Sequence, residues 1–404
     1  MEITIAGHTI KLVNDLDIVL KYDSVASTFS VAVYRDPANA LHRRLFKPNA
    51  YHQCTISHGG VLLLTGTVLN VKTMRSGDSA RKMVVLTGYS KTGVLQDCPC
   101  VHVPLQSNGK TFAEICERAC QHYGINVVVD EEVKDICAHV YEQSCPNADD
   151  TVLEYLDKMA KQLNVVLSHN AKGDLLLTKV KADKKLTTKE TKVNADLDHF
   201  NPSGPNDTVR MQASGVQTTQ VEEARPVLYD FDGANNKWMD IDHEFNGAGI
   251  HSDVVVLGQG EEKNPNGVQS EPEFSGMFDS RVQTWANKWA KANNVTGKAR
   301  GIRPRTYVQT SGDEFTVQKT ARAILGDELK GVCWPITIHG WTLNGHMVTP
   351  NQMVTAHEAE VYLYKRRRLF IQEVHLFRNE EKERAMLRCV LPECFNSDAI
   401  KDIY

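Results

Sequence analysis

Hydrophobic and polar residues alternate through most of the first 97 residues. The pattern is visible at Ile3 and Ile5, at Ile18 and Leu20, and again over residues 83–87. A period of two, interrupted by Gly, Asn and Asp, predicts short antiparallel strands with one buried face. Six or more such strands without a helix favour a β-barrel or a β-sandwich. We therefore predict a first β-domain over residues 1–97.

From about residue 98 the hydrophobic spacing becomes helical. Thr111–Glu114 and Thr151–Glu154 both have the capping-box pattern, in which a Thr hydroxyl and a Glu carboxylate satisfy the free amides at a helix start. An amphipathic run follows each box, and a strand-like segment follows each run, at 125–129 and 165–167. This repeated helix–strand pattern predicts a small α/β domain over residues 98–180.

Strand-like sequence resumes after Gly331 and continues to residue 391. The polar segment 181–216 precedes the interruption and ends in strand-like sequence. We predict a second β-domain made of residues 181–216 and 331–391, an insertion over 217–330, and a C-terminal tail over 392–404.

Two helices are expected within the insertion. Trp285 and Trp289 lie at helical spacing in the first, where they are interpreted as packing anchors rather than a ligand cage. A third capping box, Ser311–Glu314, begins the second.

The insertion also carries two adjacent blocks of opposite charge. Residues 217–280 hold 13 acidic and 3 basic side chains, whereas residues 281–310 hold 7 basic and no acidic ones. Complementary fields of this kind fix orientation and register in subunit contacts. A further basic run is Lys365–Arg368. The alternative is that these charges form solvated faces. The candidate subunit-contact residues are Arg300, Arg303, Arg305, Arg366, Arg367 and Arg368.

Composition excludes several classes of protein. The 404 residues include 46 Lys and Arg against 50 Asp and Glu, which gives a net charge of −4 and does not favour a nucleic-acid binder. No run of about 18 apolar residues predicts a membrane-spanning helix. The N-terminus lacks a basic region followed by an apolar block, so we expect no secretory signal and assembly in a cytoplasm.

The chain has ten cysteines, six of them between Cys98 and Cys145. A structural zinc site usually takes pairs of the C-x(2–4)-C kind on turns. Cys98 and Cys100 are one residue too close for that pattern, and Cys116 and Cys120 fall on a predicted helix. We therefore predict reduced, metal-free thiols that act as small buried apolar groups.

No motif predicts a catalytic, cofactor-binding or metal-binding residue. Gly109–Thr111 resembles the end of a phosphate-binding loop, but Pro104 stands where that loop needs a glycine. Asp230 with Asp240 or Asp242 offers carboxylates for a glycosidase pair, as any acidic loop does.

Several short stretches, taken in order, resemble the baseplate hub proteins of contractile phage tails, including the Mu-type hub and the late control protein D group. The stretches are Thr87–Pro99, the F-x-E-I helix with Tyr123–Val127, Gly301–Arg305, Ile338–Gly345 with Thr349–Asn351, and Leu369–Val374 with the charged hairpin and last strand that follow. The order of these stretches, which run the length of the chain, carries the resemblance.

The resemblance implies a mainly β protein with α+β parts. It implies two tail-tube-like antiparallel β-barrel domains, a small α/β domain and an inserted helical and loop segment. It also implies a homotrimeric ring that joins a sixfold tail tube to a threefold spike. The implied partners are a tail tube or distal tail protein, a central spike protein and a tape-measure protein, with genome DNA passing through the lumen without specific binding. The implied location is the virion tail baseplate.

Two other functions remain open on the sequence. The chain can be a glycan hydrolase or peptidase that acts on the cell envelope, or a carbohydrate-binding tail module. An enzyme should present a pocket with perturbed carboxylates or a metal, whereas a ring adaptor should present large subunit interfaces.

Overall fold

We describe the protein from a computed structural model. The residues described are 1–10, 13–75, 82–103, 106–142, 144–147, 149–180, 226–232, 238–249, 251, 253–259, 274–277, 304–309, 323–324, 326–379 and 382–396.

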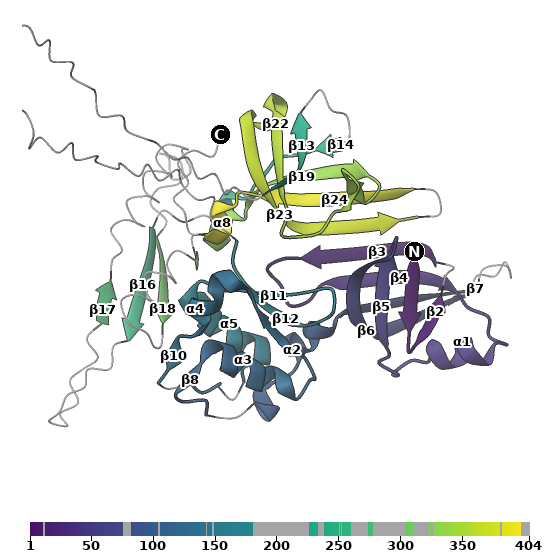
Figure 1. Ribbon diagram of the computed structural model, residues 1–404, viewed down its shortest axis with the longest axis horizontal. Coiled ribbons are helices and arrows are strands. Elements are labelled where there is room, and N and C mark those ends of the chain that lie inside the picture. Colours follow the sequence, from purple (N-terminus) through teal and green to yellow (C-terminus); the bar gives the residue numbers. More distant parts are fainter. Residues whose placement is uncertain are drawn as a thin grey trace, which may run out of the picture. The chain divides into compact units, whose positions relative to one another are not determined.

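A large curled sheet of 14 strands dominates the structure (Figure 1). Its N-terminal half consists of β1 (Glu2–Ile5), β2 (His8–Ile10), β3 (Val13–Lys21), β4 (Thr28–Tyr34), β5 (Gln53–His58), β6 (Val61–Arg75) and β7 (Lys82–Ser90). Its C-terminal half consists of β13 (Val227–Asp232), β14 (Trp238–Ile241), β15 (Glu244–Phe245), β19 (Val332–His339), β22 (Met353–Glu358), β23 (Leu363–Arg378) and β24 (Glu383–Val390). The predicted mainly β fold class is confirmed.

The two halves meet where β3 pairs with β23 in antiparallel register. Ile18 and Leu20 of β3 and Leu376 of β23 are buried there, and all three belong to one apolar core that both halves share. The pairing makes the strands of residues 1–97 and those of residues 331–391 continuous through one sheet, whereas residues 181–216, also assigned to the second β-domain, lie outside the described residues.

The α/β domain has the predicted helix starts. Thr111 caps α3 and Thr151 caps α5, and both capping boxes are complete, with each Thr accepting from a Glu amide and each Glu accepting in return. The domain has its own apolar core. It contains α2 (Val94–Asp97), β8 (Lys110–Thr111), α3 (Phe112–Gln121), β9 (Val127–Val129), α4 (Lys134–Cys137), β10 (Val140–Tyr141), α5 (Val152–Leu163), β11 (Val166–His169) and β12 (Leu175–Thr178).

The segment assigned to the insertion contributes to the large sheet. β13 pairs with β22, and β14 and β15 pair with β19, so residues 227–245 extend the C-terminal half. Alternating apolar residues such as Tyr229 and Phe231 make β13 a half-buried strand, although the acidic composition had suggested an insertion there. A separate three-stranded sheet consists of β16 (Asp253–Gln259), β17 (Phe274–Met277) and β18 (Pro304–Gln309).

Other parts of the predicted insertion and tail have different outcomes. The expected helix at Trp285 and Trp289 lies outside the described residues, as does most of the one expected after Ser311. Residues assigned to the tail include α8 (Glu393–Asn396), whose Phe395 is buried in the sheet core. Short elements between the main strands are α1 (Ala40–Leu45), β20 (Thr342–Leu343) and β21 (His346–Met347).

The two halves repeat one strand order. Along the chain, β3, β4, β5, β6 and β7 correspond in turn to β14 with β15, β19, β22, β23 and β24. Within the sheet the first set lies in the order β3, β4, β7, β6, β5. The second set lies in the corresponding order β14 with β15, β19, β24, β23, β22.

The β-bulges, where one strand carries an extra residue, match as well. The register shifts at Leu69 of β6 and at Gln372 of β23, and the same number of paired residues follows each shift. Asn70 thus corresponds to Glu373, and Arg75 to Arg378.

A second pair of bulges fixes the correspondence of the first strands. The register shifts at Asn14 of β3 and at Met239 of β14. Because bulges are specific local features rather than defects, their coincidence supports the strand-by-strand correspondence of the two halves.

Candidate subunit-contact surface

The basic run lies on the first half of β23, after the turn that joins it to β22. The turn contains the 3-10 segment Ala359–Val361 and then Tyr362, whose φ of 64° is left-handed. The indole Nε1 of Trp334 donates to the backbone oxygen of Val361 at 3.0 Å, which attaches this turn to the buried core. The run therefore sits on a fixed strand rather than a flexible tail.

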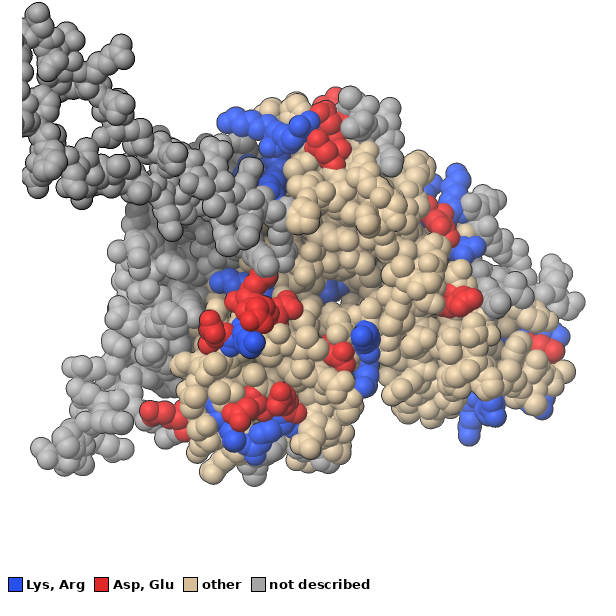
Figure 2. All heavy atoms as spheres, viewed as in Figure 1, with Lys and Arg blue, Asp and Glu red and all other residues tan. Residues whose placement is uncertain are grey.

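Arg366 forms ion pairs within its own chain. Its Nη2 atom lies 2.9 Å from Oδ2 of Asp232 and 3.2 Å from Oδ2 of Asp230, both on β13. The Thr355 hydroxyl donates to the other oxygen of Asp230 at 2.5 Å. Lys and Arg side chains lie beside Asp and Glu side chains at the end of the β22–β23 hairpin, at the top of Figure 2. Part of the acidic block thus neutralises part of the basic run inside one chain.

The other candidate arginines lie on β23, on β18 or outside the described residues. Arg367 and Arg368 are partly exposed on β23, opposite Ala356 and Thr355. Arg305 is on β18, and Arg300 and Arg303 lie outside the described residues. The predicted contact between the acidic block and residues 281–310 stays a prediction.

The structure places the carboxylates considered for a glycosidase on different strands. Asp230 is on β13 and is held by Arg366 and Thr355, whereas Asp240 is on β14 and Asp242 follows that strand. β13 and β14 pair with different strands. Asp230 therefore serves as the counter-ion of an arginine.

A partly buried ionic cluster, which no local sequence pattern predicts, joins both halves of the sheet. Nζ of Lys330 lies 2.8 Å from Oδ2 of Asp23 and 2.7 Å from Oδ1 of Asp327, and it is 4.5 Å from the ring centre of Phe395. Asp23 also accepts a hydrogen bond from Nε2 of Gln372 at 2.9 Å. Asp23 follows β3 and Gln372 is on β23, so the cluster reinforces the junction of the halves.

The ion pairs in this cluster outweigh the cost of burial. Burial raises the pKa of Asp23, but the charge of Lys330 and hydrogen bonds from Lys330 and Gln372 hold it below its ordinary value. Burial lowers the pKa of Lys330, but the two carboxylates raise it above its ordinary value. Asp23 and Lys330 are therefore charged at neutral pH.

A cavity of about 390 Å³ lies beside the cluster. Asp23, Asp327 and Lys330 line one part, and Glu154, Asp157 and Lys161 of α5 line another. Lys161 pairs with Asp157 at 2.7 Å, so both lysines of the cavity already have carboxylate partners.

The cysteines have the buried character that the sequence predicts. All ten are free thiols, and eight of them are buried. Burial raises the pKa of Cys54, Cys120 and Cys137 to about 12, so these thiols are protonated and unreactive at neutral pH. Cys145 is exposed and Cys98 is partly exposed.

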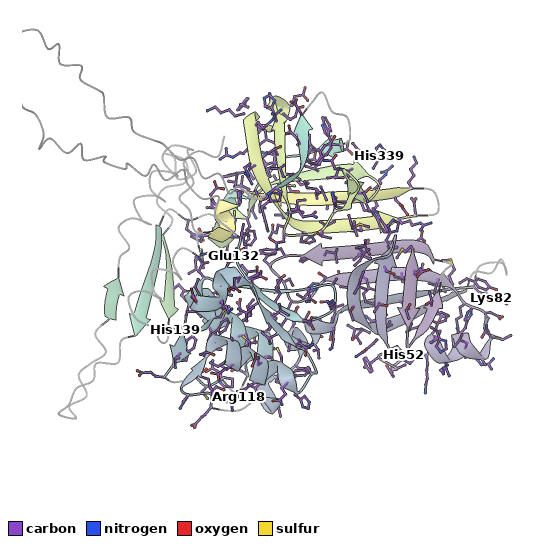
Figure 3. The ribbon with its side chains drawn as sticks, in the orientation of Figure 1. His52, Lys82, Arg118, Glu132, His139 and His339 are labelled. Carbon is purple, nitrogen blue, oxygen red and sulfur yellow. The ribbon has the colours of Figure 1, made fainter. Side chains whose placement is uncertain are left out.

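Ionisable side chains elsewhere are dispersed. The six residues labelled in Figure 3 come from separate elements and do not point into a common pocket: His52, Lys82, Arg118, Glu132, His139 and His339. Within the described ranges, no group of three His, Cys, Asp or Glu side chains is arranged to hold a metal ion. No helix in the described parts of the chain combines the length and apolar composition needed to cross a bilayer.

The chain shares its fold with two tail proteins. One is the 43 kDa tail protein of prophage MuSo2 from Shewanella oneidensis, with a TM-score of 0.66 and 14% identity over 98% of this chain and 99% of that one. The other is the tail protein from Neisseria meningitidis MC58, with a TM-score of 0.66 and 15% identity over 98% of each chain. No curated protein matches the chain in sequence. The chain therefore has the fold of these two tail proteins.

The α/β domain matches a family model. Residues 92–179 match the family described as "Baseplate hub protein gp44-like, second domain". The matched segment nearly coincides with the domain predicted over residues 98–180. The predicted resemblance to the phage baseplate hub family is thereby confirmed.

Proposed function

We propose that the protein is the structural hub of a tail baseplate, and that three copies form a ring joining the sixfold tail tube to the threefold spike. The observation that carries this proposal is the gp44-like hub domain at residues 92–179, set within a chain that shares the fold of tail proteins over nearly its whole length. The two halves of the large sheet would be the two tube-like domains, so three chains would supply six similar units to the tube.

In this role the protein acts by contact rather than by chemistry. Its partners would be the tube or distal tail protein, the central spike protein and the tape-measure protein, with DNA passing through the lumen without specific binding. It would be assembled in the host cytoplasm and located in the virion tail. The charges described above are largely paired within the chain, which suits a structural component.

Native mass spectrometry of the full chain tests the proposal. We expect a complex of three copies of the 45.2 kDa chain. A chain that stays monomeric at high concentration contradicts the ring. Release of peptide or sugar fragments from purified cell envelope, at a rate proportional to the amount of added protein, would instead favour the hydrolase.

A further inference from the structure

The contact that joins the two halves of one chain has a counterpart that is not used within the described structure. It would be formed by the outer edge of β14 and β15 and by the part of β6 that follows its bulge. Inside the chain, β3 is the strand of the N-terminal half that borders the C-terminal half. It pairs with the part of β23 that follows the bulge at Gln372. The strand that corresponds to β3 is β14 with β15, and the one that corresponds to β23 is β6. In the described structure, β14 and β15 pair only with β19, and β6 beyond its bulge pairs only with β7.

We propose that β14 and β15 of one copy pair with β6 of the next copy, in the same register in which β3 pairs with β23. This inference rests on the proposed function, because it names the surfaces by which the ring would close. Each chain carries one edge of each kind, so the contact is head-to-tail, the kind of interface that forms closed rings.

The matched bulges give the register of this contact. Within the chain, Glu373 lies opposite Lys21, Val374 opposite Leu20 and His375 opposite Val19. Transferred to the corresponding strands, the pairs between copies are Asn70 with Asn246, Val71 with Phe245, Lys72 with Glu244, Thr73 with His243, and Met74 with Asp242.

The exposed fractions of side chains at both strand edges support a contact that a single chain leaves unformed. Leu20 is 5% exposed where β23 covers it, whereas its counterpart Phe245 is 42% exposed. Leu376 is fully buried beneath β3, whereas its counterpart Thr73 is exposed. A neighbouring strand would cover Phe245 as β23 covers Leu20.

Charge supports the same pairing. On the outer face of the contact within the chain, Nε2 of His375 lies 2.8 Å from Oδ1 of Asp17. The residues that correspond to His375 and Asp17 are Lys72 of β6 and Asp242, which follows β14. This pair again combines a nitrogen base with a carboxylate. Glu244 would lie directly opposite Lys72, and both side chains are exposed in the single chain, where Oε2 of Glu244 also lies 3.4 Å from Nη1 of Arg388. Opposite charges across strands stabilise a pair, whereas like charges directly opposite destabilise it.

Disulfide trapping tests the register. In a Cys145→Ser background, which removes the exposed thiol, the double variant Lys72→Cys with Glu244→Cys should give covalent oligomers under mild oxidation. Either single variant should remain monomeric on a denaturing non-reducing gel. The matched control is Lys72→Cys with Phe245→Cys, since a slip of one residue puts the two side chains on opposite faces.

Two further variants test the energetics. Phe245→Ser should weaken association about tenfold because it removes an apolar ring that only a neighbour buries. Val101→Ser, at a side chain 75% exposed in the α/β domain, should leave association unchanged. Lys72→Glu should weaken each contact about two- to fivefold, as expected for an exposed pair, and adding Glu244→Lys should restore part of that loss. Circular dichroism verifies that each variant folds.

The outcomes separate this inference from the ring itself. Trapping of the Lys72 and Glu244 pair, with little in the slipped control, supports the inference. A trimer by native mass that gives no trapping at this pair, and whose association Phe245→Ser leaves unchanged, overturns it but retains the proposed function. A chain that is monomeric under all conditions overturns both.

Discussion

Glu373 of β23 lies directly opposite Lys21 of β3, and their side chains form an ion pair with an Nζ–Oε2 distance of 3.4 Å. This pair stands at the only place in the described structure where β-strands of the two halves pair. Beneath it, Leu20 and Leu376 are buried in the core. The junction therefore combines a polar outer row with an apolar inner row, and the two rows contribute unequally.

Leu376→Ala should destabilise the chain much more than Glu373→Gln. Truncating a fully buried Leu costs about 2–5 kcal/mol, whereas a solvent-exposed ion pair contributes about 0–1 kcal/mol. Lys21 and Glu373 are 40% and 24% exposed in their side chains, so water screens the pair. Urea unfolding of both variants measures the difference. Equal losses would show that the ion pair, rather than the core, joins the halves.

Lys330→Met should lower the free energy of unfolding by about 3 kcal/mol, because it leaves Asp23 largely buried without its cation. Asp23→Asn should cost less, since Lys330 keeps Asp327 as a partner. Thermal unfolding at neutral pH gives the comparison. A larger loss in Asp23→Asn than in Lys330→Met would contradict this account of the cluster.

The same cluster should give an acid-dependent loss of stability. The pKa of Asp23 in the folded chain is below its ordinary value of 3.8. Its contribution is therefore complete above that ordinary value and is lost as the pH falls through the lowered pKa. Unfolding measured between about pH 5 and pH 2 should show a shallower decline in Asp23→Asn than in the wild type. Equal declines in stability in the two proteins would show that Asp23 does not contribute to the acid-dependent loss of stability.

The helix starts and the alternating strands could be read from the sequence because both are local. Thr111 and Thr151 act on amides three residues away, and Ile3 and Ile5 alternate within one strand. Such signals need no knowledge of what the element packs against.

The sheet junction and the ionic cluster could not be read in that way. Lys330 and Asp23 are separated by most of the chain, and nothing near either residue indicates the other. The acidic composition around Asp230 also concealed a strand, because only two buried aromatic residues, Tyr229 and Phe231, alternate with the aspartates of β13. The repeat of the two halves lies in strand order and bulge positions, which depend on pairing between distant segments of the chain.

Only Cys145, and more slowly Cys98, should react with a thiol reagent in the native protein, because the other eight thiols are buried. The raised pKa of those thiols also leaves little thiolate to react. Mass spectrometry after brief alkylation identifies the modified sites. Modification of Cys116 or Cys120 before Cys145 would contradict the packing of α3.

Purified protein should contain no stoichiometric zinc, as the spacing of Cys98 and Cys100 predicts. Elemental analysis of the chain and of a variant with Cys98→Ser and Cys100→Ser should give the same low value. About one zinc per chain, lost in the variant, would show that a metal site exists.

Reversing Arg300, Arg303 and Arg305 to Glu should slow ring assembly, most visibly at low salt. Exposed charges act mainly on association rate and register, and at about 0.15 M salt they are screened beyond roughly 8 Å. Arg366→Glu should act differently, because Arg366 pairs with Asp230 and Asp232 of its own chain. It should lower the thermal stability of the single chain by placing a third carboxylate beside these two. Light scattering across salt concentrations, with thermal unfolding alongside, separates the two effects. Identical assembly of the wild type and the triple reversal at every salt concentration would mean that the charge blocks are solvated faces.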